Sequence, residues 1–154
     1  MLEELERTLH EDIPITTQLG ITVLRYEADA LALKAPLDAN INHKGTAFAG
    51  SIYAVATLAG WGLIWLLLKE AEIAARIVIQ ESSIRYRLPI TRDMVATCTK
   101  PSPARLEQFF VMLRRKGIAR LELQTQIKEG GQTAVEFNGR YVASLHKEHV
   151  YQEP

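Results

Sequence analysis

The residues best suited to chemistry lie in a short polar stretch, NINHKGT (residues 40–46), that precedes a long apolar segment. Asn42 can orient a carbonyl group or a water molecule through its side-chain amide, or it can bond its own backbone in a turn. His43 can accept a proton near neutral pH, although a solvated loop histidine is the more ordinary interpretation. The stretch is therefore a candidate site for a reaction at a carbonyl group.

The apolar segment that follows, residues 47–68, carries no charged side chain. If it is a helix, the backbone N–H groups of its first turn are unpaired and lie at the positive end of the helix dipole. Such amides can stabilise the negative oxygen that forms when a carbonyl group is attacked. Ala49 and Gly50 are small enough for a substrate oxygen to approach these amides, and Thr46 is a candidate N-cap.

A general base is needed to activate water, and Glu81 is the preferred candidate. It lies in the polar patch QESS (residues 80–83), where the apolar pattern of a predicted strand changes phase. Such a change indicates a β-bulge or a polar spot beside a pocket, whereas an outward-facing strand glutamate is the alternative. Thr57 is a weaker candidate that could hold a water molecule, although a helical threonine usually bonds the carbonyl four residues earlier.

Two groups of cations could bind the phosphate groups of a ligand, because a guanidinium group presents paired donors to a phosphate. One group is Arg85 with Arg87, and the other is the run of residues 114–116. Both groups could equally be solvated surface charge. No metal motif, P-loop or dinucleotide fingerprint is found in the sequence, so we expect no cofactor and no metal.

The elements that must position these residues are one very apolar helix and about six strands. Leucines at helical spacing predict a short amphipathic helix before Pro14, and a second helix is predicted over residues 104–117. Most of the strands alternate between apolar and polar residues, as half-buried antiparallel strands do. The strands are predicted over residues 21–27, 31–37, 76–89, 93–99, 118–128 and 135–145.

The apolar segment is long enough to cross a membrane, but the rest of the chain favours a buried helix. Its glycines and alanines dilute its hydrophobicity, and the amphipathic strands need an apolar partner that only this segment can supply. We therefore expect an α+β fold in which a curved antiparallel sheet wraps around one long buried helix. The length of the chain predicts a single domain, residues 1–154.

The composition narrows the classes of partner and the compartment. Lys+Arg and Asp+Glu are both 18, which argues against a nucleic-acid partner and against attraction to an anionic membrane. The single cysteine, Cys98, lies in a strand-like run and is expected to be a small core residue. A single cysteine cannot form a disulfide within the chain, which suits a reducing compartment. The acidic N-terminus is unlike a secretion signal, so we expect a cytoplasmic protein.

Four groups of residues carry a resemblance to a known family. They are LGI (19–21), APL (35–37), the run from Asn40 through FAGSIY (48–53) to TLAGWG (57–62), and IRYRLP (84–89). Together with the order of the elements, they make nearly the whole chain resemble the hot-dog fold of acyl-CoA thioesterases, and more narrowly the thioesterase domain found as the C-terminal part of YiiD-type proteins. Many hot-dog thioesterases carry an Asn-x-x-Gly-x-x-His-Gly-Gly pattern followed by an acid in the helix.

The resemblance implies a hydrolase of acyl thioesters of coenzyme A or acyl carrier protein, assembled as a homodimer or a tetramer with sites between subunits. The family asparagine and glycine fall on Asn42 and Gly45, whereas the histidine falls on Phe48 and the acid on Thr57. The base must then come from elsewhere, and Glu81, assisted by His43, is preferred.

The alternative function is a non-catalytic module that binds acyl thioesters or has a regulatory role, because the family histidine and acid are absent. A hydrolase and a binding module would use the same surface. The residues expected to contact the substrate are Gly45, Thr46, Phe48, Ala49, Gly50, Ser83 and Arg85.

Overall fold

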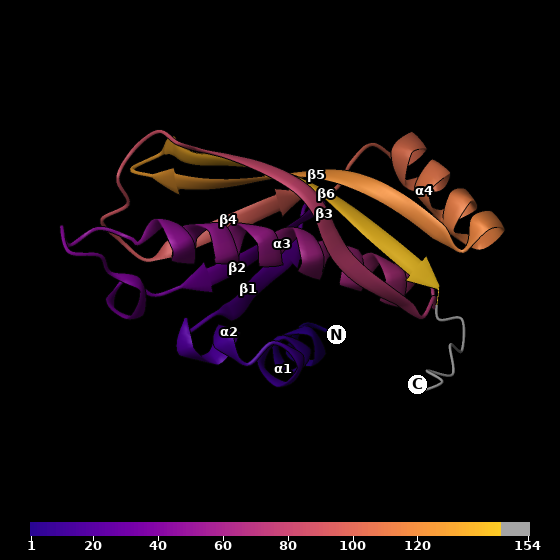
Figure 1. Ribbon diagram of the computed structural model, residues 1–154, viewed down its shortest axis with the longest axis horizontal. Helices are drawn as coiled ribbons and strands as arrows, with labels where there is room; N and C mark the ends of the chain where they lie inside the picture. The colour runs from indigo at the N-terminus through magenta and orange to yellow at the C-terminus, as the bar shows by residue number, and fades with distance from the viewer. Residues whose placement is uncertain (146–154) are drawn as a thin grey trace, which may run out of the picture.

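The computed structural model describes residues 1–145 and contains one antiparallel sheet of six strands. The sheet curves over a long helix, α3 (Ala49–Glu70), which lies beneath it in Figure 1. The predicted architecture, a curved antiparallel sheet around one buried helix, is confirmed. In sheet order the strands are β1 (Thr22–Glu27), β2 (Ala30–Ala35), β4 (Met94–Thr99), β5 (Ile118–Glu129), β6 (Gln132–Leu145) and β3 (Ala75–Tyr86).

Shorter helices close the ends of the core. The first, α1 (Leu2–Asp12), packs against β1 and α3 through two fully buried leucines, Leu5 and Leu9. The helix α4 (Pro103–Lys116) begins at the N-cap Ser102, ends at Gly117 in the left-handed conformation, and packs against β5. The remaining helical segments are α2 (Ile15–Gln18) and the 3-10 turn η1 (Asp38–Asn40).

The helix α3 packs against five of the six strands, β2 to β6. It has the length and composition of a membrane span, but 72% of its most apolar 18-residue window is buried inside the fold. A Cβ atom at Gly60 would overlap the hydroxyl group of Tyr141, so only glycine allows β6 to approach this closely. The Tyr141 hydroxyl donates to the carbonyl oxygen of Thr57 at 2.7 Å and ties the sheet to the helix backbone.

The predicted bulge in β3 is present. The register of β3 against β6 shifts between Ile79 and Glu81, so Gln80 is the extra residue. Before the shift the half-buried residues of β3 are odd-numbered, and after it they are even-numbered, as Ser82 and Ile84 show. The bulge therefore turns the even-numbered side chains of the second half of β3 toward α3.

The expected N-cap of α3 was wrong. The helix begins at Ala49, and Phe48 is its N-cap with extended backbone angles. The reason is that the preceding residues are held in extended pairings: the Ala47 amide donates to the Ile90 carbonyl at 2.9 Å, and the Phe48 amide to the Asn40 carbonyl at 2.7 Å.

Cys98 is a fully buried residue of β4, as expected for a small core side chain. Burial raises the pKa of its thiol to about 12, although a hydrogen bond with Thr125 opposes the shift. Because the thiolate is the nucleophilic form, Cys98 is inert in the folded protein at neutral pH.

Candidate functional site

Asn42 organises the loop that leads into α3. Its side-chain oxygen accepts hydrogen bonds from the backbone amides of Lys44 at 2.8 Å and Thr46 at 3.1 Å. Its side-chain nitrogen donates to the Thr46 hydroxyl at 2.9 Å and to the Ala47 carbonyl at 3.4 Å. Since both of its amide hydrogens have partners inside the loop, the geometry matches the turn-forming interpretation of this asparagine.

The N-terminus of α3 is open. Phe48 offers no side-chain acceptor to the first turn, and Ala49 and Gly50 are both exposed. Helix amides without a cap are donors for a negatively charged or polarised oxygen. We expected the space beside Gly50 to admit a substrate oxygen. Instead the ring of Phe48 lies there, so close that a Cβ atom at Gly50 would overlap it.

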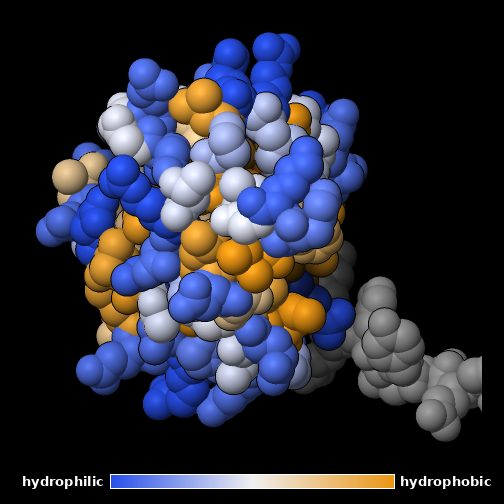
Figure 2. Space-filling view, turned by 90° about the vertical axis from the view of Figure 1, so that its left-hand side faces the viewer, coloured by the Kyte–Doolittle hydropathy of each residue, from blue (hydrophilic) through white to orange (hydrophobic). Residues whose placement is uncertain are grey.

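Apolar side chains gather on the surface around this helix start. Figure 2 looks at the end of the molecule where α3 begins, and it shows hydrophobic side chains in the middle of a mostly hydrophilic face. In the loop before α3, Ile41 is 51% exposed and Phe48 is 54% exposed. Exposed apolar surface rimmed by polar residues is typical of binding sites for ligands or partners.

Three hydroxyl groups that the sequence analysis overlooked lie beside the first turns of α3. The Tyr53 hydroxyl is hydrogen-bonded to the Ser82 hydroxyl, and the Tyr86 hydroxyl donates to the Ala49 carbonyl at 3.3 Å. Burial, and to a smaller extent Tyr53, raise the pKa of Tyr86, which keeps it protonated. The signal was available, because Ser82 and Tyr86 share the even numbering of the inward-facing residues after the bulge.

Thr57 lies about two turns further along α3 than the helix start. Its hydroxyl oxygen is buried and has no hydrogen-bond partner among the described residues 1–145. The expected bond from a helical threonine to the carbonyl four residues earlier is therefore not formed. A buried hydroxyl without a partner has free capacity for a water molecule.

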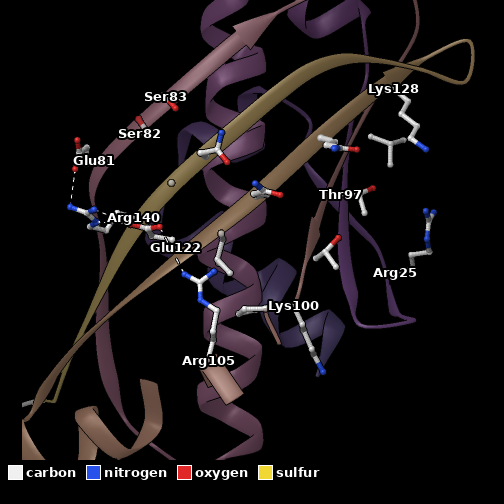
Figure 3. A pocket seen from close by; sticks show the side chains of 18 residues that line it. Arg25, Glu81, Ser82, Ser83, Thr97, Lys100, Arg105, Glu122, Lys128 and Arg140 are labelled. Atoms are coloured by element: carbon white, nitrogen blue, oxygen red, sulfur yellow. Dashed lines mark hydrogen bonds and ion pairs between the residues drawn. The ribbon is translucent and has the colours of Figure 1, made fainter. Parts of the chain in front are cut away.

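The side chain of Glu81 lies on the outer face of the sheet, turned away from α3 (Figure 3). Its carboxylate forms an ion pair with Arg140 at 3.0 Å, and the same guanidinium group binds Glu122 at 2.9 Å. On this face Glu81, Ser82 and Ser83 all line an open trough of about 980 Å³. Arg85 is exposed two residues further along β3. Arg140 lowers the pKa of the Glu122 carboxyl group through this hydrogen bond.

The structure thus places most of the predicted site residues at the start of α3, Thr57 about two turns further along this helix, and three on the outer part of β3. Those gathered in the loop and the first turn are Asn42, His43, Gly45, Thr46, Phe48, Ala49 and Gly50. Those on the outer part of β3 are Glu81, Ser83 and Arg85. Among residues 1–145, no group of three His, Cys, Asp or Glu side chains is arranged to hold a metal ion.

Residues 2–145 match a protein family described as "Putative thioesterase (yiiD_Cterm)". The match spans nearly all of the described chain. The protein therefore belongs to this thioesterase family.

Solved structures of similar proteins support this placement. A protein of unknown function from Chlorobaculum tepidum is 33% identical, with 94% of each chain covered and a TM-score of 0.89. A "putative thioesterase" from Shewanella oneidensis is 32% identical, with 94% of this chain and 97% of that chain covered and a TM-score of 0.82. A thioesterase from Haemophilus influenzae is 18% identical, covers 97% of this chain and 94% of its own with a TM-score of 0.74, and shows the fold alone.

The role of Asn42 predicts a measurable loss of stability. Asn42→Ala removes four hydrogen bonds within the loop, so we expect the free energy of unfolding to fall by about 1–2 kcal/mol. Asn42→Asp keeps the two bonds accepted from backbone amides and should lose less than half of that amount. Urea unfolding of both variants tests this, and equal losses would contradict the importance of the backbone bonds.

Proposed function

We propose that the protein hydrolyses an acyl thioester of coenzyme A or of acyl carrier protein to a free acid and a thiol. The observation that carries the proposal is the open N-terminus of α3, where the exposed Ala49 and Gly50 follow a loop held by Asn42. Membership of a thioesterase family supports the same reaction class.

In the proposed reaction, a water oxygen attacks the thioester carbonyl carbon. The carbonyl oxygen becomes negative and is stabilised by the amides of Ala49 and Gly50 and by the helix dipole. A general base takes the proton from the attacking water. The carbon–sulfur bond then breaks, the thiolate leaves, and the base returns the proton to it.

The positions of the two ionisable candidates support His43 over Glu81 as this base. His43 lies on the same loop as Asn42, whereas the Glu81 carboxylate is held by Arg140 on the outer face. An imidazole is also the commonest side chain for this role. We therefore propose His43 as the proton acceptor in place of Glu81, which the sequence favoured.

We propose further that the protein is a homodimer that pairs through β3. This strand is 12 residues long and lies at one edge of the sheet, and Val78 on it is 58% exposed. A long uncovered edge strand presents unpaired backbone groups to another chain. Sedimentation of the purified protein as a monomer at micromolar concentration would contradict this assembly.

The second candidate function is a non-catalytic module that binds acyl thioesters. The absence of two family residues favours this function. Phe48 stands at the position of the family histidine and Thr57 at the position of the family acid, and neither side chain can exchange a proton at neutral pH. A binding module would be stabilised thermally by acyl-CoA and would not consume it.

The hydrolytic function is tested with a panel of acyl thioesters of short, medium, long and aromatic chains on both carriers. We expect release of free thiol from at least one member, at a rate proportional to the protein concentration. Thermal stabilisation without thiol release from any member would support the binding module instead.

The assignment of the base predicts different results for two variants. His43→Gln is expected to lower kcat/KM by about 10²-fold or more, because it removes the proton acceptor. Glu81→Gln is expected to stay within about twofold of the wild type, because its carboxylate faces the other side of the sheet. A loss in Glu81→Gln of more than about tenfold, in a protein that still unfolds cooperatively, would restore Glu81 as the base.

A further inference from the structure

Tyr53 and Ser82 form a hydroxyl pair that joins α3 to the edge strand β3. The ring of Tyr53 is fixed by Phe137, which it meets edge to face with a centroid distance of 5.5 Å and an interplanar angle of 82°. Tyr53 is nevertheless 36% exposed. The pair is thus rigid on the protein side and accessible from the surface.

The pair lies on the same face of α3 as the open helix start. Tyr53 follows Gly50 by three residues and Ala49 by four, and residues at these spacings are neighbours on a helix surface. The Tyr86 hydroxyl, which binds the Ala49 carbonyl, comes from the same inward-facing row of β3 as Ser82. Hydroxyl groups from both elements therefore converge on the first turns of α3.

The bulge at Gln80 is what turns Ser82 toward Tyr53. Ser82 borders the outer trough together with Glu81 and Ser83. Without the register shift between Ile79 and Glu81, the odd-numbered residues would continue to face α3, and the Ser82 hydroxyl would point away from Tyr53. Bulges often re-aim a side chain next to an active site. The hydroxyl partner of Tyr53, Ser82, thus lies directly after the register shift of β3.

We propose that the Tyr53 hydroxyl donates a hydrogen bond to the carbonyl oxygen of the bound thioester and is polarised by Ser82. The inference rests on the proposed hydrolysis. In this proposal the Ser82 hydroxyl donates a hydrogen bond to the Tyr53 oxygen, so that the Tyr53 hydroxyl is free to donate to the substrate. As the carbonyl oxygen becomes negative during attack by water, this hydrogen bond strengthens, and no covalent bond to the protein forms.

The pair then supplies a side-chain donor in a site that lacks the family histidine and acid. Backbone amides alone leave the orientation of the carbonyl group less defined, because a single helix turn presents donors in one direction. A phenolic hydroxyl that approaches from the side of β3 adds a second direction. Tyr53 is accordingly a catalytic residue of the proposed reaction, and Ser82 is a positioning residue.

The kinetic test compares Tyr53→Phe with Tyr26→Phe, which removes a hydroxyl group from β1 at the opposite edge of the sheet. Tyr53→Phe should lower kcat by about 10²-fold with little change in KM, as the loss of one oxyanion donor does. Tyr26→Phe should leave both constants unchanged. Adding Ser82→Ala to Tyr53→Phe should cause no further loss, because Ser82 acts only through Tyr53.

A second measurement does not depend on turnover. A ketone analogue of acyl-CoA, with a methylene group between the sulfur and an isotopically labelled carbonyl carbon, binds without being hydrolysed. We expect its carbonyl stretching frequency to fall on binding to the wild type and to Tyr26→Phe, and to fall less on binding to Tyr53→Phe. The two proposals can therefore fail separately. If the protein hydrolyses no thioester but the frequency shift still depends on Tyr53, the hydrogen bond from Tyr53 to the carbonyl oxygen is supported and the proposed hydrolysis is not.

Two outcomes overturn the inference. One is a Tyr53→Phe variant with the kcat and the carbonyl frequency of the wild type, which would leave the hydroxyl pair as a contact between helix and strand only. The other is a wild-type protein that neither turns over the thioesters nor binds the ketone analogue. In the first case, a lower melting temperature of Tyr53→Phe would assign the pair to stability.

Discussion

The structure depends on the close packing of one uncharged helix against the inner face of a curved sheet. The closest approach is at Gly60, where the absence of a side chain lets Tyr141 lie against the helix and donate to the Thr57 carbonyl at 2.7 Å. Burial raises the pKa of Tyr141 and keeps its phenol protonated as a donor. Because the helix contacts five strands, this packing determines the curvature of the sheet and the position of both helix ends.

The open end of α3 follows from how the chain enters it. Residues before the helix are held in extended pairings with Asn40 and Ile90, so the backbone turns into the helix only at Ala49. The N-cap position then falls on Phe48, whose ring cannot accept a hydrogen bond from the first turn. The same pairings that delay the start of the helix therefore leave its amides free for a ligand, next to exposed apolar surface.

The bulge in β3 divides the chemistry of this strand between two faces of the sheet. On the outer face, Arg140 bridges Glu81 and Glu122. The side chains that line the trough still carry an excess of positive charge, because Arg25, Lys100, Arg105 and Lys128 line it as well. On the inner face, the hydroxyl groups of Ser82 and Tyr86 approach α3. Glu81 and Ser82 both border the trough but have different partners, Arg140 and Tyr53, because successive side chains of a strand point to opposite faces.

The order and type of the main elements followed from periodicity and from the need of amphipathic strands for an apolar partner. The bulge was also readable, since the apolar residues of β3 change from odd to even positions. The sequence favoured Glu81 for its chemistry, and its carboxylate lies in an ion pair with Arg140, whereas Ser82 shares the even numbering of Ile84 and Tyr86 and reaches Tyr53 on α3. For Asn42, both interpretations were open until the hydrogen bonds of the loop were known.

The sequence by itself determined that a charge-free helix is buried under six strands, because no other segment could cover their apolar faces. Only the tertiary structure decided which side chains meet at the start of that helix. Tyr53 and Ser82 are 29 residues apart, and their contact depends on how far the sheet wraps around α3 and on where the bulge changes the phase of β3. Spacing along the chain predicts which face a residue occupies, but the distance between two elements is set by the packing of the whole core.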